Sequence, residues 1–154
     1  MLNIVLFEPE IPGNTGNIAR SCVATESRLH LVGRLGFSLE DKYLKRAGLD
    51  YWLHLDITVH ERWEHFLKTV PDVSRLFFYE KDAEKLFWDA KHQDGDYLVF
   101  GAETRGFPRK ITQDYAQQFY RLPMTGKVRS LNLSSTVSAA LYQALHQLGY
   151  TQSN

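Results

Sequence analysis

Short apolar segments alternate with segments of helical spacing along the whole chain, and this alternation is the feature that most limits its fold. It favours an α/β fold with a mainly parallel sheet flanked by helices, because a crossover helix usually joins one parallel strand to the next. The apolar runs are continuous, as expected of strands that are covered on both faces. The strands that we expect are 2–7, 29–32, 53–59, 75–79, 97–101 and 119–122, and the helices are 18–26, 38–47, 61–70, 83–90 and 133–148.

Length and composition are those of an ordinary globular protein. The 154 residues suit a single domain, 1–154, and the contents of 44% hydrophobic and 23% charged residues are typical of that class. No apolar run approaches ~18 residues, so we expect no membrane span. The one cysteine, Cys22, excludes an internal disulfide and predicts a cytoplasmic location.

Charge is balanced overall but uneven along the chain. The formal net charge of zero argues against a protein that holds nucleic acid by bulk charge. Residues 80–96 hold six acidic and three basic side chains, whereas residues 105–129 hold six basic side chains and one acidic. Two interpretations remain open, namely solvated faces of opposite sign and a local anion site within 105–129.

Three polar segments follow predicted strands and are candidates for a ligand site: 12–17, 102–108 and 123–134. In open α/β sheets ligands bind at the edge where the carboxyl ends of the strands meet. In the first segment we expect a helix to begin near Gly16, with Asn14 in the turn ahead of it. Arg20 then has a guanidinium suited to phosphate, or else it extends to solvent beside a capping asparagine.

The second segment contains one carboxylate, Glu103, between Gly101 and Gly106. Glu103 is either a surface group that pairs with Arg105 or Arg109, or an acceptor for an amine or hydroxyl of a ligand.

The third segment ends in Ser130 and Asn132, just before the last helix. Both residues are good N-caps, and both could also face a ligand. Elsewhere Lys45 and Arg46 precede aromatic residues, which suits either RNA stacking or an exposed helix beside the core. The six histidines lack metal-ligand spacing, so we expect no metal.

The three segments together resemble the three motifs of the SPOUT superfamily of RNA ribose methyltransferases. Residues 9–20 are similar to the first motif, 100–106 to the second and 129–134 to the third. Length, order and spacing most resemble the small single-domain tRNA 2′-O-methyltransferases that act on the wobble nucleotide of certain leucine tRNAs, which residues 46–51 also match. The chain departs from this pattern at 78–82, where the family usually has a glycine.

The resemblance implies a fold, a cofactor and a substrate. The fold is an α/β sheet with a C-terminal deep trefoil knot, here within about 75–150, an exception to the rule that chains are not knotted. The cofactor is S-adenosylmethionine, and the enzyme works as a homodimer on tRNA, at position 34 (cytidine or modified uridine). The positions that match cofactor contacts are Phe78, Gly101, Leu122, Ser130 and Leu131.

The resemblance also assigns the reacting centre. Asn14, Arg20, Glu103 and Asn132 match family positions that line it, and the expected RNA contacts are Arg20, Lys45, Arg46 and Arg129. In related enzymes the arginine that matches Arg20 is proposed as the base, but a guanidinium rarely gives up its proton, so we favour a phosphate clamp. The alternatives are ribose methylation at another tRNA or rRNA site, and a knotted RNA-binding factor without catalysis.

Overall fold

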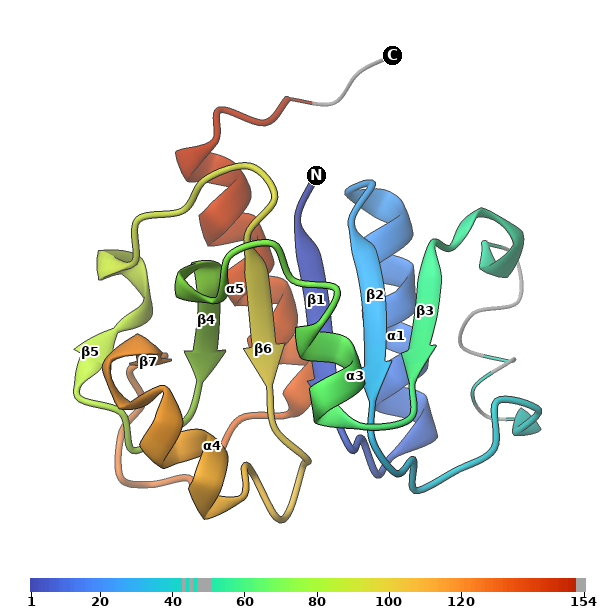
Figure 1. Ribbon diagram of the computed structural model, residues 1–154, viewed down its shortest axis with the longest axis horizontal. Helices are drawn as coiled ribbons and strands as arrows, with labels where there is room; N and C mark the ends of the chain where they lie inside the picture. Colours follow the sequence, from blue (N-terminus) through green and yellow to red (C-terminus); the bar gives the residue numbers. More distant parts are fainter. Residues whose placement is uncertain (43, 45, 47–50, 152–154) are drawn as a thin grey trace.

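The computed structural model describes residues 1–42, 44, 46 and 51–151, and a seven-stranded parallel sheet forms its centre (Figure 1). The strand order is β3-β2-β1-β6-β4-β7-β5, and every neighbouring pair is parallel. This confirms the predicted α/β class with a mainly parallel sheet. The strands are β1 Asn3–Phe7, β2 Arg28–Val32, β3 Ile57–His60, β4 Leu76–Tyr79, β5 Lys85–Leu86, β6 Tyr97–Phe100 and β7 Phe119–Arg121.

Helices cover both faces of this sheet (Figure 1). On one face lie α1 (Pro12–Ala24) and α5 (Leu133–Gln147), and on the other α3 (Trp63–Leu67) and α4 (Arg109–Asp114). The structure also contains short 3₁₀ turns: η1 Trp52–His54, η2 Val73–Arg75, η3 Phe87–Asp89 and η4 Ala116–Gln118.

The sheet separates two apolar clusters because successive side chains of a strand point to opposite faces. In β4, Phe77 and Tyr79 join the cluster under α1 and α5, whereas Leu76 and Phe78 join the cluster under α3 and α4. All four are buried, which explains why β4 has a continuous apolar sequence without alternation.

Helix α1 begins earlier than expected, at Pro12 rather than at residues 16–18. Proline is favoured in a first helical turn, since its missing N–H would have no partner there. Asn14 therefore lies inside the helix and is buried, and its predicted place in a turn is wrong.

The expected helix at 83–90 is also wrong, because this segment forms β5 and η3. Lys85 and Leu86 pair with the edge of β7, so the backbone is extended there. Helix α4 was not expected from the sequence, because it has no apolar stripe and buries only Ile111. The expected strand 53–59 shortens to β3 after η1, and the expected helix 38–47 lies partly outside the described residues.

Two helices from opposite ends of the chain lie side by side on the sheet. The hydroxyls of Ser21 in α1 and Ser138 in α5 are 3.2 Å apart. Because α1 follows β1 and α5 follows β7, both helices begin near the carboxyl edge of the sheet (Figure 1). Within the part of the chain that the structure describes, no helix has the length and apolar character needed to span a bilayer.

Candidate functional site

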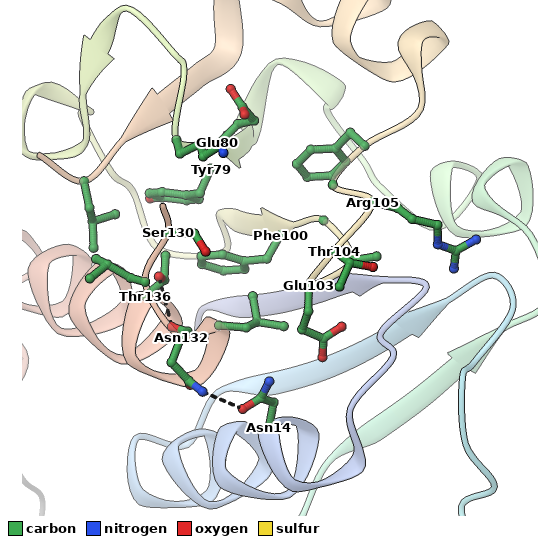
Figure 2. Close-up of a pocket in the computed structure, with 18 of the residues that line it drawn as sticks. Asn14, Tyr79, Glu80, Phe100, Glu103, Thr104, Arg105, Ser130, Asn132 and Thr136 are labelled. Carbon is green, nitrogen blue, oxygen red and sulfur yellow. Dashed lines mark hydrogen bonds between the residues drawn. The ribbon is translucent and has the colours of Figure 1, made fainter. Parts of the chain in front are cut away.

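A cavity of about 540 Å³ opens at the carboxyl edge of the sheet (Figure 2). Residues from all three polar segments line it, as the sequence predicts. The candidate residues that line it are Asn14, Gly101, Glu103, Leu122, Arg129, Ser130, Leu131 and Asn132.

One wall of the cavity is aromatic. Tyr79 and Phe100 end the neighbouring strands β4 and β6 and pair directly across them. Their rings are nearly parallel, with an interplanar angle of 12° and centroids 4.8 Å apart. Leu122, which follows β7, adds an aliphatic surface, and Ser130 also lines the cavity (Figure 2). The wall therefore suits a flat apolar ligand group with a polar edge.

A second wall carries two side-chain amides that join α1 to α5. Asn132 is the N-cap of α5, and its Oδ1 accepts the backbone N–H of Ser134 at 2.9 Å. Its Nδ2 then donates to Oδ1 of Asn14 at 3.1 Å. A backbone N–H can only donate, so these two hydrogen bonds fix which side of each amide carries the oxygen. The NH₂ of Asn14 therefore remains available as a donor. Figure 2 shows that this nitrogen lies on the side of Asn14 that faces Glu103.

Glu103 binds backbone rather than an arginine. Its two carboxylate oxygens accept the N–H groups of Glu10 (2.7 Å) and Ile11 (3.1 Å). Ile11 is the N-cap of α1 and makes no capping side-chain hydrogen bond, and Glu103, from a distant loop, binds the two backbone amides that lead into the helix.

Glu10 in turn binds the loop that carries Glu103. Its carboxylate accepts the N–H of Thr104 at 3.0 Å and the Thr104 hydroxyl at 2.7 Å, and the Arg105 guanidinium lies 3.8 Å away. The Thr104 hydroxyl, with the nearby backbone amides and Arg105, lowers the pKa of Glu10. We call these contacts of Glu10 and Glu103 the Glu10–Glu103 clasp. It holds the loop after β6 against the start of α1.

The loop after β6 also depends on a close backbone approach. Ala102 and Gly106 exchange two backbone hydrogen bonds, of 3.1 and 2.8 Å. A Cβ at Gly101 would lie 2.7 Å from the carbonyl carbon of Gly106, closer than packed atoms approach. Glycine is therefore required at 101 for the loop to fold back against the cavity.

Several predicted site residues do not line this cavity. Phe78 is fully buried on the other face of the sheet, stacked on Phe119 at 4.9 Å, and the next two residues, Tyr79 and Glu80, line the cavity in its place. Strand alternation, together with the expected cavity at the end of β4, could have identified Tyr79 from the sequence.

Some of the basic residues line the cavity and others do not. Arg129 lines the cavity and is exposed, as are Lys81 and Arg105. Arg20 is exposed on α1, away from the cavity lining, with its guanidinium carbon 5.5 Å from the centre of the Tyr51 ring. Arg46 is exposed, and Lys45 lies outside the described residues.

The described residues contain no group of three or more His, Cys, Asp or Glu side chains placed to hold a metal ion.

Comparisons with known proteins agree on one family. Residues 1–142 match the model of the SpoU rRNA Methylase family. The tRNA (cytidine(34)-2′-O)-methyltransferase of Escherichia coli strain K12 is 48% identical, over 97% of this chain and 96% of its own length.

Solved structures share the fold over nearly the whole chain. One, described as giving insights into the 2-OH methylation of C/U34 on tRNA, is 43% identical with a TM-score of 0.90, over 97% of this chain and 92% of its own. The SpoU methyltransferase AviRb from Streptomyces viridochromogenes, in complex with AdoMet, is 22% identical with a TM-score of 0.85, over 96% of this chain and 60% of its own. At that identity the likeness to AviRb concerns the fold alone.

Proposed function

The chain belongs to the SpoU rRNA Methylase family, and from this premise we propose that it methylates the ribose 2′-hydroxyl of nucleotide 34 of a tRNA, with S-adenosylmethionine as methyl donor. The observation that supports this most is the cavity itself, in which the three motif segments meet. Near full-length relatives that are 45–48% identical carry the name tRNA (cytidine(34)-2′-O)-methyltransferase. The finer proposal is a cytidine or modified uridine at position 34 of leucine tRNAs.

The residues of the cavity fit S-adenosylmethionine. Its adenine is flat and apolar on both faces, which suits the wall of Tyr79, Phe100 and Leu122. Its polar edges suit the backbone around Gly101, Ser130 and Leu131. We propose these six residues as the cofactor site, with Tyr79 in place of Phe78.

S-Adenosylmethionine supplies a methyl group on a sulfonium, an electrophile for a hydroxyl oxygen. The chain must hold that oxygen in line with the methyl group, so that the oxygen–methyl bond would form as the methyl–sulfur bond breaks and S-adenosylhomocysteine leaves. It must also let the hydroxyl proton pass to solvent water. We assign the first task to the free NH₂ of Asn14, which Asn132 orients, because it can donate to the ribose oxygen. Glu103 serves this arrangement indirectly, since its carboxylate is already bound by the amides that precede α1.

Arg20 and Arg129 are proposed to hold the RNA. Arg129 lies at the cavity and can contact the phosphates beside the target nucleotide. Arg20 is exposed and outside the cavity lining of its own chain, which favours the phosphate clamp over a base. Arg46, and Lys45 outside the described residues, would extend this contact along the RNA.

We also propose a homodimer that packs through the outer faces of α1 and α5. Ala24, Ser135 and Ala139 are exposed there, and small residues permit close helix approach. Two copies would double the basic surface offered to one tRNA.

We also propose that the chain is a single domain, 1–154, with a trefoil knot within about 75–150. A tRNA substrate further implies a cytoplasmic location.

The test uses a leucine tRNA transcript and a matched transcript with 2′-deoxyribose at position 34 only. Labelled S-adenosylmethionine should transfer its methyl group to the first transcript and not to the second, and nucleoside mapping should place the label on ribose 34. Label on a base, or equal transfer to the deoxy transcript, would reject position 34 as the target. A protein that binds S-adenosylmethionine neither alone nor with tRNA would be a non-catalytic factor.

A further inference from the structure

A chain of buried polar side chains leads from the amino end of the sheet to the aromatic wall of the cavity. The Tyr79 hydroxyl lies 3.3 Å from Nε2 of His92, and Nδ1 of His92 lies 3.4 Å from a carboxylate oxygen of Asp96. Asp96 in turn accepts two hydrogen bonds of 2.7 Å from the Arg75 guanidinium. The side chains of His92 and Asp96 are 0% and 1% exposed, so these contacts are shielded from water. The proposed reaction uses none of these three residues.

The ionised carboxylate of Asp96 sets the direction of the hydrogen bonds in this series of side chains. Burial would raise the pKa of Asp96, but hydrogen bonds from His92, Arg75 and the N–H of Gln93 hold it below its ordinary value. The ionised carboxylate only accepts, so Nδ1–H of His92 donates to it. In the neutral form of the imidazole the lone pair is on Nε2, which then accepts the hydrogen bond of the Tyr79 hydroxyl.

His92 is held independently of the cavity. Its backbone N–H donates to the Gln147 side chain at 2.9 Å, and the same side chain donates to the Ala90 carbonyl at 2.8 Å. Its ring lies 4.5 Å from that of Phe77, between centroids. The acceptor for Tyr79 is therefore anchored to α5 and to the core, whatever occupies the cavity.

We propose that His92 is a positioning residue, which holds the Tyr79 ring parallel to Phe100 so that the two rings form the wall against which the adenine of the cofactor packs. The inference rests on the proposed function. The Tyr79 ring reaches its place from the end of β4, and its hydroxyl is the only polar atom that can anchor the far end of the side chain. Without that anchor the ring is free to tilt from the 12° stack on Phe100.

The experiment is calorimetric titration of the full chain with S-adenosylmethionine and with S-adenosylhomocysteine, which share the adenine. Tyr79→Phe keeps the ring and removes only the hydroxyl, and His92→Leu removes the acceptor. Each should raise Kd for both ligands about fivefold, the loss expected for one net hydrogen bond. The double variant should bind no more weakly than the worse single variant, because both changes remove the same bond.

Methyl transfer gives a second readout. KM for the cofactor should rise with Kd, while kcat stays within about twofold, because the wall contacts the adenine equally in the ground state and the transition state. A purely structural role would instead lower the unfolding midpoint and the fraction of active protein without changing Kd.

Tyr115→Phe is the matched control. Tyr115 stacks on Phe78 at 5.0 Å on the other face of the sheet, so the same loss of a hydroxyl should leave Kd unchanged. Unchanged Kd in Tyr79→Phe, or fully additive losses in the double variant, would overturn the inference even if His92→Leu failed to fold. A wild-type chain that binds neither ligand would overturn the proposed function instead.

Discussion

Asn132 donates a 3.1 Å hydrogen bond from Nδ2 to Oδ1 of Asn14, so one side chain both caps helix α5 and orients the amide of Asn14 in helix α1. The two residues are 118 positions apart in the chain. The cap and the contact with Asn14 use different atoms of Asn132, and substitution can therefore separate them.

Asn132→Asp should keep the N-cap of α5 but lose the orientation of the Asn14 amide at the cavity. An aspartate oxygen still accepts the N–H of Ser134, so the free energy of unfolding should change by less than about 0.5 kcal/mol. Its other oxygen cannot donate to Asn14, whose amide must turn and present Oδ1 to the cavity, so kcat should fall by about tenfold or more. Asn132→Ala should lose the cap as well, at about 1 kcal/mol in urea unfolding. Wild-type kcat in Asn132→Asp would contradict the orientation that we assign to Asn14.

Glu103→Gln should destabilise the protein through the Glu10–Glu103 clasp. A glutamine offers one oxygen to two backbone N–H groups, and its NH₂ faces a donor, so we expect a loss of about 1 kcal/mol in urea unfolding together with lower kcat. Glu84→Gln, an exposed carboxylate near the sheet edge, removes the same charge and should change stability by less than about 0.5 kcal/mol. Equal stability of the two variants would show that the clasp contributes nothing.

The sequence could predict six of the seven strands and the meeting of the three polar segments, because buried apolar runs and sheet-edge loops follow from local pattern. The start of α1 at Pro12 had one signal in the sequence, the proline itself, but the acceptor for the backbone before the helix is Glu103, 92 residues away from Ile11, and no local pattern reveals it. The helix predicted at 83–90 was wrong for a similar reason. Its extended backbone is set by pairing with β7, not by its own residues.

The cofactor wall combines a residue within reach of the sequence with one that is not. Phe78 and Tyr79 are both aromatic and both buried, and strand alternation, which places them on opposite faces of the sheet, decides which of them faces the cavity. The partner of Tyr79, His92, lies in a segment without any recognisable pattern. Long-range hydrogen bonds of this kind leave no trace in local periodicity.

Gly101→Ala should be severely destabilising. The added Cβ would lie 2.7 Å from backbone of Gly106, which can move only if the paired loop opens, so we expect a loss of about 2–3 kcal/mol in urea unfolding and weaker cofactor binding. Gly13→Ala is the control, because no atom lies within 4 Å of its added Cβ and the residue is helical. It should stabilise by about 0.5 kcal/mol. A tolerated Gly101→Ala would mean that the loop after β6 is not tightly packed.

Arg20→Ala should separate RNA binding from cofactor binding. Arg20 does not line the cavity, so Kd for S-adenosylmethionine should stay unchanged while methyl transfer falls about a hundredfold, if it holds a phosphate at the reacting nucleotide. Arg28→Ala removes the same charge from a surface ion pair with Asp56 and should leave both quantities near wild type. Methyl transfer by Arg20→Ala at the rate of Arg28→Ala would remove Arg20 from the mechanism.

Stability should fall at mildly acidic pH because of a buried histidine pair. Nδ1 of His30 lies 3.0 Å from Nε2 of His60, and Nε2 of His30 lies 3.0 Å from Oδ1 of Asn3. Burial, and then the charge of His60, lower the pKa of His30 to about 4. The folded chain therefore keeps His30 neutral, whereas the unfolded chain binds a proton near pH 6.5. The unfolded state binds more protons between these two values, so the free energy of unfolding decreases as pH falls from about 6.5 to about 4.

For His30 alone this linkage corresponds to about 2 kcal/mol lost at pH 5 relative to pH 8. Urea unfolding of the wild type and of His30→Gln at both pH values measures it. The glutamine cannot titrate, and its amide can still bond to both neighbours, so the variant should lose about 2 kcal/mol less than the wild type over this range. An equal pH dependence in the two proteins would place the acid sensitivity elsewhere in the molecule.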